Sequence, residues 1–365
     1  MAIRRITLAD IVFGQPLPWD VFSTPSSPHP LIEKGRVAAP GQLERLLDAG
    51  LYAEAGSAPS LLQHLNQVNR RLEHILLSLR DQNSADHALR QLAQELIGIV
   101  ERDQDIVLAA IFLNQIAGAY AVRHCTEAAI IVCIIARAMR KTDPEIALVT
   151  AAAMTMNVGM VRQADLYQGR DNALSGEERA AIRRHPSDSV DMLRWAGIHD
   201  DAWLELVLLH HENDDGSGYP QGRLGDEISQ NAKLIGLADR YCAFVSARNY
   251  RRSLLPPVAL GKLACDKEMP VDPAVVAHFS YEIGPYPPGT LVRLENGEIG
   301  VVSRRPDAAG VLRVHVLRGA DGGTLPLAEM RLTCEQDCEV AEALHEDQAR
   351  VRFTMQHIWG ELASL

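Results

Sequence analysis

The sequence predicts a mostly α-helical protein with a small β module near each end. Hydrophobic residues make up 47% of the chain and aromatic residues only 5%, a balance that favours helices over a β-sandwich. Apolar residues recur at steps of three or four through most of residues 59–280, and short β-type runs flank this region. The length of 365 residues indicates two or three domains at about 150 residues each.

Residues 1–55 are predicted to form a small β/α module. Within residues 3–36, the runs IRRITL and LIEKGRVAAP have the composition of short strands, and proline- and serine-rich turns separate them. Residues 40–52 are predicted to form a helix, because a proline stands near the start of this segment and Gly50 near its end.

Residues 56–104 are predicted to form a helical connector. Two apolar series, Leu61 to Leu76 and Leu89 to Val100, have helical spacing and are separated at Ser84–Asp86. The two helices either pack within a bundle or form a dimerising coil, which would give a homodimer through the N-terminal helices. The histidines of this polar region are expected to be solvated: His64, His74 and His87.

The remaining chain divides into a helical core and a β appendage. Residues 105–282 contain several long apolar segments of helical type. Residues 283–334 have an antiparallel β pattern with an Asn-Gly turn at 296–297. Residues 335–365 are predicted to close the chain as an amphipathic helix.

Charge and cysteine content restrict the partners and the compartment. The chain has 36 Lys and Arg against 47 Asp and Glu, a net charge of −11. This excludes broad non-specific DNA binding but leaves room for a small phosphate ligand. Six scattered cysteines indicate a reducing, cytoplasmic compartment. Neither a signal peptide nor a membrane span is expected.

The strongest chemical signal lies between His210 and Pro220, which read HHENDDGSGYP. Adjacent histidines do not share one face of a helix, but their rings can converge on one metal ion where a helix ends. The following residues supply turn chemistry, since aspartate side chains satisfy backbone donors and glycines allow positive φ. This loop comprises Asp215, Gly216, Gly218, Tyr219 and Pro220. Glu212 and Asp215 are expected to brace it.

The segment resembles the signature HHExxDGxGYP of the HD-GYP family, which are bacterial metal-dependent phosphodiesterases of the second messenger cyclic di-GMP. The resemblance extends from about Tyr120 to Tyr281. It implies an HD-type helical bundle over residues 105–282, preceded by the long helical region and followed by the β module.

The resemblance also implies roles for individual residues. The family's metal positions correspond to His124, His185, His210, His211 and Asp239. Arg248 and Arg251 match basic positions that contact the dinucleotide phosphates, and guanidinium groups suit bidentate phosphate contacts. The alternative for these arginines is ordinary surface charge at a helix end. Tyr120 stands where some members carry a glutamate that supports a third metal, so a trinuclear site is not expected.

The sequence departs from the family at its histidine–aspartate dyad. The family reads AALLHDIGK where this chain reads AAMTMNVGM, so Met156, Asn157 and Met160 replace His, Asp and Lys. Two metal ions held about 3.5–4 Å apart need an anionic bridge, and neither a neutral amide nor a soft thioether supplies one. The remaining histidines can hold one Fe, Mn or Zn ion, or they can persist as hydrogen-bonded core residues without metal.

Three functional hypotheses follow. The first is a signalling protein that binds cyclic di-GMP or a related nucleotide with little or no hydrolysis. The second is a phosphodiesterase that uses a mononuclear site built on His185, His210 and His211. The third is an interaction module whose GYP loop docks onto partners such as diguanylate cyclases.

Overall fold

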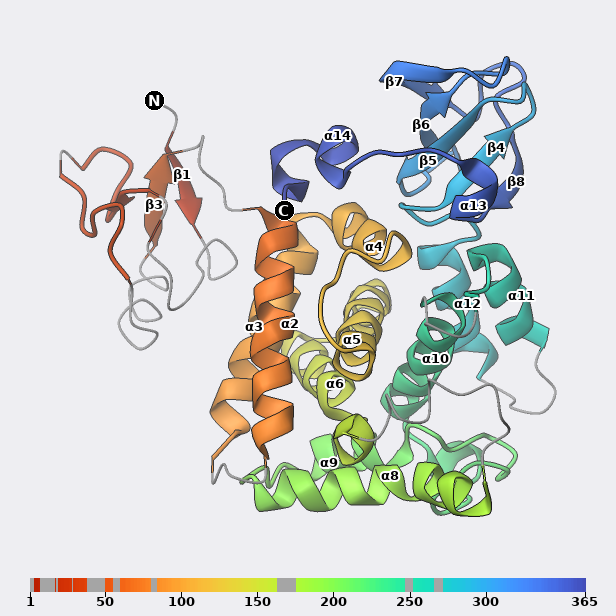
Figure 1. Ribbon diagram of the computed structural model, residues 1–365. Helices are drawn as coiled ribbons and strands as arrows, with labels where there is room; N and C mark the ends of the chain where they lie inside the picture. The colour runs from red at the N-terminus through yellow and green to blue at the C-terminus, as the bar shows by residue number, and fades with distance from the viewer. Residues whose placement is uncertain are drawn as a thin grey trace.

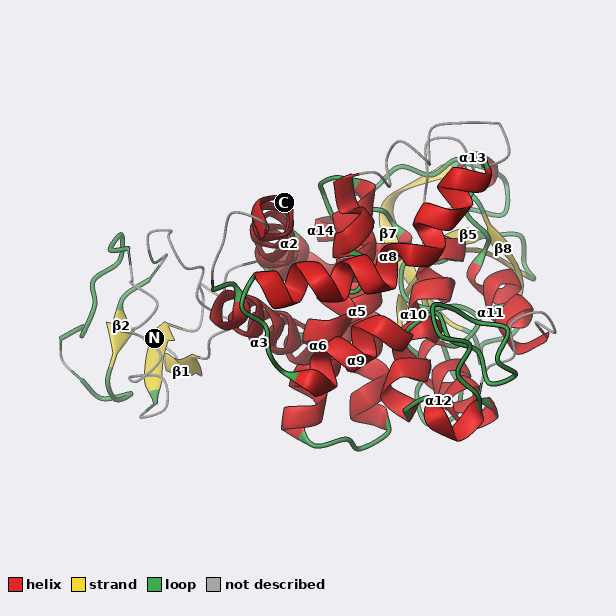
Figure 2. Ribbon diagram, turned by 90° about the horizontal axis from the view of Figure 1, so that it is seen from below, coloured by secondary structure: helices red, strands yellow, loops and turns green. Residues whose placement is uncertain are grey.

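A computed structural model gives the architecture of the chain (Figure 1). It describes residues 3–6, 17, 19–27, 29–37, 50–54, 60–79, 84–162, 175–246, 252–265 and 272–365. Within these ranges the fold is mostly helical, as the sequence predicts, with a small sheet near the N-terminus and a larger one near the C-terminus (Figure 2).

The N-terminal sheet has three antiparallel strands in the order β1-β3-β2. The strands are β1 (Ile3–Ile6), β2 (Val21–Phe22) and β3 (Leu51–Glu54). The helix predicted over residues 40–52 is wrong at its end, because Leu51 and Ala53 are buried and Tyr52 between them is partly exposed. This alternation is the period of a strand. Residues 40–49 of the predicted helix lie outside the described residues.

The helical core contains most of the described chain and one continuous apolar interior. Its elements are α2 (Leu61–Ser78), α3 (Asp86–Arg102), α4 (Gln104–Phe112), α5 (Tyr120–Ala138), α6 (Asp143–Thr155), η3 (Val158–Met160), α8 (Gly176–Trp195), α9 (Asp201–Leu209), η4 (Gly225–Glu227), α10 (Gln230–Val245), α11 (Pro256–Cys265) and α12 (Pro273–Ile283).

Helix α5 is the centre of this core. It is buried on every side from Cys125 to Ala136 and packs against α2, α3, α6, α10 and α12. A helix that is apolar all round is stable only when neighbours cover it. Two helices of the core begin with capping boxes. Thr142 and Glu145 form the one at α6, and Ser175 and Glu178 form the one at α8.

The two connector helices pack within the chain. Leu61, Leu65, Val68 and Leu72 of α2 are buried in the same apolar core as the facing residues of α3. The bundle interpretation is therefore confirmed for this apolar face, and the homodimer stays a prediction. The prediction for His64 is wrong: its side chain is buried and its Nε2 lies 3.6 Å from a carboxylate oxygen of Glu95.

The C-terminal sheet has five antiparallel strands in the order β7-β6-β5-β4-β8. They are β4 (Leu291–Leu294), β5 (Ile299–Arg304), β6 (Arg313–Arg318), β7 (Thr324–Leu332) and β8 (Val340–Leu344). The predicted Asn-Gly turn joins β4 to β5, and Gly297 has the positive φ of +87° that such a turn requires.

The amphipathic helix predicted over residues 335–365 is wrong. Residues 340–344 form β8 and pair with the free edge of β4, so the β module extends beyond residue 334. An exposed strand edge carries unpaired backbone groups, and this pairing satisfies them. Only short helical segments follow: α13 (Glu346–Ala349), α14 (Met355–Trp359) and η5 (Gly360–Ala363).

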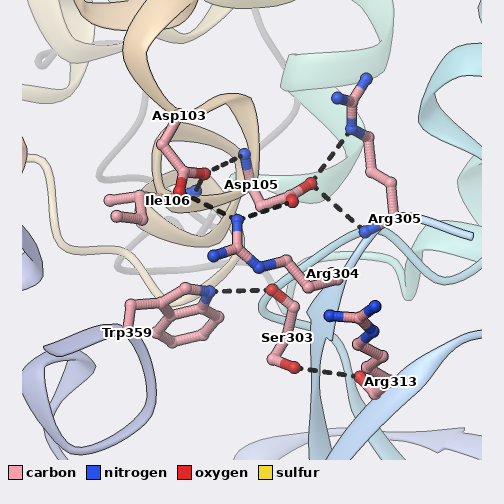
Figure 3. A network of polar contacts seen from close by, with 8 residues as sticks. All are labelled: Asp103, Asp105, Ile106, Ser303, Arg304, Arg305, Arg313 and Trp359. Atoms are coloured by element: carbon pink, nitrogen blue, oxygen red, sulfur yellow. Dashed lines mark hydrogen bonds and ion pairs between the residues drawn. The ribbon is translucent and has the colours of Figure 1, made fainter. Parts of the chain in front are cut away.

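Ion pairs attach the β module to the helical core (Figure 3). Arg304 Nη1 at the end of β5 contacts Asp103 Oδ2 at 2.9 Å and Asp105 Oδ2 at 3.1 Å, at the start of α4. Arg305 donates its Nε to Asp105 Oδ1 at 3.0 Å. The indole of Trp359 donates to the Ser303 carbonyl at 2.9 Å, which ties the C-terminal segment to the same strand.

Candidate metal and ligand site

Four helices bring the sequence-predicted metal residues into the helical core, and the substituted dyad joins them from the end of a fifth. His124 lies near the start of α5, Asn157 lies just beyond α6, and His185 lies in the middle of α8. His210 caps the end of α9, His211 follows it, and Asp239 lies in α10. All these side chains are buried except that of His211, which is partly exposed. The residues are distant in sequence, so only the helical packing makes them neighbours.

Three histidines form a compact cluster. The nearest ring nitrogens of His185, His210 and His211 all lie within 4.8 Å of one another. The Nε2 atoms of His185 and His210 are 3.3 Å apart. Both rings use their other nitrogen on the backbone: Nδ1 of His185 donates to the Ile182 carbonyl at 2.6 Å, and Nδ1 of His210 to the Val207 carbonyl at 2.7 Å.

These hydrogen bonds determine the tautomers of both rings. A carbonyl accepts only, so Nδ1 carries the proton and each Nε2 presents a lone pair. Burial lowers the pKa of His185 to about 3 and also lowers the pKa values of His210 and His211. The three imidazoles are therefore neutral near pH 7, and two lone pairs face each other without a proton between them.

The geometry fits one divalent ion. A tetrahedral ion with metal–nitrogen bonds of about 2.0–2.1 Å sets two nitrogen ligands about 3.3 Å apart. This is the separation of the His185 and His210 Nε2 atoms, and a cation there would relieve the repulsion of their lone pairs. The Nδ1–carbonyl bonds supply the outer hydrogen bonds that orient metal-bound histidines in proteins. The residues present thus fit a three-histidine metal site.

A second group of polar side chains lies beside the cluster. His124 Nε2 is 2.8 Å from Asp239 Oδ1, and Asn157 Nδ2 approaches the same oxygen at 3.4 Å. Burial would raise the pKa of Asp239, but the hydrogen bond from His124 holds it well below its ordinary value. The Asp239 charge in turn raises the pKa values of all three clustered histidines against burial, so the carboxylate faces the cluster.

The substituted dyad has the physical consequences expected from its chemistry. Met156 is fully buried and belongs to the apolar core. Asn157 contributes a neutral amide, whose Oδ1 is buried without a hydrogen-bond partner. Met160 ends the short segment η3, which packs directly on α8 beside His185. An anionic bridge between two ions is thus replaced by an amide that donates to Asp239.

The loop after His211 is braced as the sequence predicts. Glu212 accepts hydrogen bonds from the backbone N–H groups of Gln221, Gly222 and Arg223 at 2.7, 3.2 and 2.9 Å. Asp215 Oδ1 accepts from the backbone and hydroxyl of Ser217 at 2.9 and 2.6 Å. Gly218 lies against the preceding turn, where an added Cβ would come 2.6 Å from the His211 carbonyl.

The loop places Tyr219 on the histidine cluster. The ring of Tyr219 stacks on that of His211 with centroids 4.7 Å apart and planes 26° apart. The Arg183 guanidinium lies over the same tyrosine, 4.8 Å from its ring centre. The sequence analysis did not select Arg183, although its position two residues before His185 was the available signal.

The other candidate residues lie away from the cluster or outside the described part of the chain. Arg248 and Arg251 lie outside the described residues, so their phosphate-binding role stays a prediction. Asp214 pairs with Lys233 Nζ at 2.9 Å rather than joining the histidines. Cys334 is exposed and Cys338 buried, and both are free thiols in the β module.

Comparison with known proteins identifies relatives of this chain. A family profile described as HD domain matches residues 110–275. The chain is 29% identical over 211 residues to the cyclic di-GMP phosphodiesterase PA4108 of Pseudomonas aeruginosa, covering 58% of this chain and 50% of that protein. It is 32% identical over 144 residues to a cyclic di-GMP phosphodiesterase of Vibrio cholerae, covering 38% of this chain and 29% of that protein.

A third curated relative acts on a different cyclic dinucleotide by name. The 3'3'-cGAMP-specific phosphodiesterase 3 of Vibrio cholerae is 26% identical over 158 residues, covering 43% of this chain and 34% of that protein. The chain thus spans about half the length of the first of these relatives and less of the others.

The structure is similar to that of Bd1817, an HDG"Y"P protein from Bdellovibrio bacteriovorus. The TM-score is 0.51 at 13% sequence identity, covering 76% of this chain and 98% of the other. At this identity the similarity establishes the fold. None of the helices in the described ranges combines the length and the apolar character that crossing a membrane requires.

Proposed function

We propose that the protein is a cyclic di-GMP signalling protein with a reduced, one-metal centre and little or no hydrolysis, because an HD-domain profile matches residues 110–275 and the similar proteins include cyclic di-GMP phosphodiesterases. The observation that carries this proposal is that the site keeps a histidine cluster suited to one ion but has lost the charged residue that would support a second. Two neutral imidazoles direct their Nε2 lone pairs at each other across 3.3 Å, whereas the dyad position offers a neutral amide.

In this proposal the histidines would bind the metal ion and Asp239 would supply negative charge beside them. His185, His210 and His211 would hold a single Fe, Mn or Zn ion. When bound, such an ion supplies Lewis acidity toward a phosphate oxygen at an open coordination position. Asp239 remains ionised and keeps its negative charge beside the cluster, where His124 and Asn157 orient its Oδ1.

The proposal of weak hydrolysis follows from charge. Two adjacent cations repel, and a carboxylate bridge is the usual group that offsets this repulsion. Asn157 has no charge, and its amide N–H groups are directed at Asp239. One ion can still bind a phosphate group, but the second ion that would share the attacking and leaving oxygens has too few ligands.

Features of the same site favour two alternative functions, a slow phosphodiesterase and a protein-docking module. The three-histidine cluster would leave an open position on its ion, which favours slow phosphodiesterase activity from a mononuclear centre. The loop from Asp215 to Pro220 is partly exposed, which favours a third role in docking a diguanylate cyclase-type partner. Neither alternative requires the dyad that Met156 and Asn157 replace.

The decisive experiment measures metal content, ligand binding and turnover on the same protein. We expect about one ion per chain by elemental analysis, calorimetric binding of cyclic di-GMP, and turnover near background with added Mn or Fe. The absence of binding up to about millimolar ligand, near −4 kcal/mol, would contradict the proposal. Rapid hydrolysis by the one-metal protein would instead establish the mononuclear phosphodiesterase.

A restoring variant tests why hydrolysis is weak. The triple substitution Met156→His, Asn157→Asp and Met160→Lys returns the family's dyad and lysine. We expect it to bind a second ion and to gain turnover of at least tenfold, which corresponds to about 1.4 kcal/mol of barrier. The single substitution Met160→Lys is the matched control, because it adds the cation without a metal ligand. A second ion without any gain in turnover would show that the dyad is not the limiting part.

A further inference from the structure

Tyr219 connects the histidine cluster with an exposed arginine. Its ring stacks on His211, and the guanidinium of Arg183 in α8 lies over the same ring. The centroid of the Tyr219 ring is 4.7 Å from that of His211 and 4.8 Å from the Arg183 guanidinium carbon. Tyr219 also contacts His185 edge-on, with ring centroids 6.4 Å apart. The arginine thus lies one ring away from the cluster.

The environment of Arg183 leaves its hydrogen-bonding edges available. Its side chain is exposed, and within the described part of the chain it forms no ion pair. The neighbouring Arg184 differs, because its Nε contacts Asp188 at 3.4 Å. A guanidinium stacked on a ring through its face still presents N–H donors in its plane, and this fork matches a phosphate in a bidentate manner.

A second arginine lies on the neighbouring helix α10. Arg240 directly follows Asp239, and its Nε donates to the Gly236 carbonyl at 3.2 Å. Its Nη2 is 3.9 Å from the position of an added Cβ at Gly236, where α10 meets the end of α9. The Arg240 charge therefore lies near the end of α9, and it adds to the larger effect of burial in lowering the pKa of His211.

Within the described part of the chain, the nearby acidic groups do not pair with Arg183. Glu212 directs its carboxylate at three backbone N–H groups of the loop, and Asp188 pairs with Arg184. Asp239 is buried and bonded to His124. Local positive charge at the stack thus coexists with the net charge of −11 of the whole chain.

Met160 is neutral, whereas the resembled family carries a lysine at this position. Met160 ends η3, and η3 packs so closely on α8 that a Cβ at Gly159 would lie 2.7 Å from the His185 carbonyl. Arg183 stands in the same stretch of α8. Arg183 of α8 can therefore provide near the cluster the positive charge that Met160 does not.

We propose that Arg183, held in place by Tyr219, forms a phosphate-binding subsite beside the histidine cluster. The subsite would take one phosphate group of an anionic ligand through the guanidinium fork of Arg183. This inference rests on the proposed function for the identity of the full ligand, cyclic di-GMP, but not for the phosphate chemistry itself. Arg183 is a ligand-binding residue in this scheme, and Tyr219 is a positioning residue.

The experiment compares Arg183→Gln with the matched control Arg184→Gln, since both replace an exposed arginine of α8 by the same side chain. Cyclic di-GMP and inorganic phosphate are titrated by calorimetry into the metal-loaded protein at fixed ionic strength. We expect Arg183→Gln to weaken both ligands about tenfold and Arg184→Gln to change them less than twofold. Arg183→Lys, which keeps the charge but loses the fork, is expected to recover part of the loss.

Metal content separates a ligand-binding role from a structural one. All three variants are expected to retain the wild-type amount of metal, because Arg183 does not contact the histidine nitrogens. Loss of metal in Arg183→Gln alone would show that the arginine only supports the loop, and would overturn the inference.

The two ligands separate the inference from the proposed function. If the wild type binds phosphate but not cyclic di-GMP, and Arg183→Gln weakens phosphate, the subsite stands and the proposed function fails. If the wild type binds cyclic di-GMP and Arg183→Gln binds both ligands as tightly, the subsite is wrong and the proposed function stands. Binding of neither ligand to the wild type contradicts both.

Discussion

At the scale of single residues, backbone carbonyls determine the chemistry of the histidine cluster. The carbonyls of Ile182 and Val207 each accept a hydrogen bond from the Nδ1–H group of a histidine one turn later in the chain. Both rings must then present Nε2 as an acceptor, and the helices bring those acceptors within 3.3 Å. Burial keeps the rings neutral, so the cluster is ready to accept a cation near neutral pH.

The same burial makes the stability of the metal-free protein depend on pH. His185 has a pKa of about 3 in the folded chain against about 6.5 in the unfolded chain. Between these values the unfolded chain binds a proton that the folded chain does not, so the stability contribution is full above pH 6.5 and is lost as the pH falls toward 3. The loss at pH 5.5 is about 1.4 kcal/mol for this one residue.

Urea unfolding of the chelator-treated protein at pH 7.5 and pH 5.5 measures this effect. The wild type is expected to lose about 1.4 kcal/mol more between these pH values than the variant His185→Gln, which lacks the titrating ring. Equal losses in the two proteins would show that the folded chain protonates His185 readily.

At the scale of elements, close helix crossings determine where the histidines point. Gly236 of α10 faces the end of α9, where an added Cβ would lie 2.3 Å from the His210 carbonyl. No side chain larger than hydrogen fits this crossing without displacement. The glycine thus allows the end of α9, with both adjacent histidines, to approach the helix that carries Asp239.

Gly236→Ala is expected to destabilise the protein and to loosen metal binding, because the His210 backbone must move. We expect a loss of about 1–3 kcal/mol in the free energy of unfolding. Gly261→Ala in α11 is the matched control, since no atom lies within 4 Å of its Cβ position, and it should be neutral or stabilising by up to about 1 kcal/mol.

Denaturant unfolding and metal titration of both variants check this prediction. A Gly236→Ala protein with wild-type stability and wild-type metal affinity would show that the crossing relaxes without moving the ligands.

At the scale of the whole molecule, the described residues form three apolar clusters, and polar contacts add to apolar ones in joining the β module to the helical core. The N-terminal sheet and the β module each have their own cluster of buried side chains beside the large helical core. Asp105 joins the helical core to the β module by accepting hydrogen bonds from the Arg304 and Arg305 side chains and the Arg305 backbone (Figure 3).

Asp105→Ala is expected to loosen the β module from the helical core. Arg304 keeps Asp103 as a partner and Arg305 keeps Glu282, so the loss should be moderate, about 1–2 kcal/mol. Cleavage by a protease near residues 284–290, between α12 and β4, should become faster. Glu342→Ala is the control, because its pair with Arg293 is exposed and should contribute less than about 1 kcal/mol. Unchanged protease resistance in Asp105→Ala would assign the attachment to the apolar contacts instead.

The sequence by itself determined the helical class, the placing of the helical core between two β modules and the residues of the histidine cluster. Local patterns carry this information: the spacing of apolar residues in α2 and α3, the Asn-Gly turn before β5, and the adjacent histidines that precede the loop. The bracing by Glu212 and Asp215 also followed from local turn chemistry. Each of these features depends on residues close together in the chain.

Tertiary structure alone decided the features that depend on distant partners. Residues 340–344 have an amphipathic pattern but form β8, because the edge of β4 offers hydrogen bonds that an isolated helix cannot match. His64 is buried because Glu95 of the next helix lies opposite it. The 3.3 Å contact of His185 with His210 and the placement of Arg183 over Tyr219 likewise exist only after α8, α9 and the loop pack together. The sequence supplies the donor atoms, whereas packing sets the distances between them.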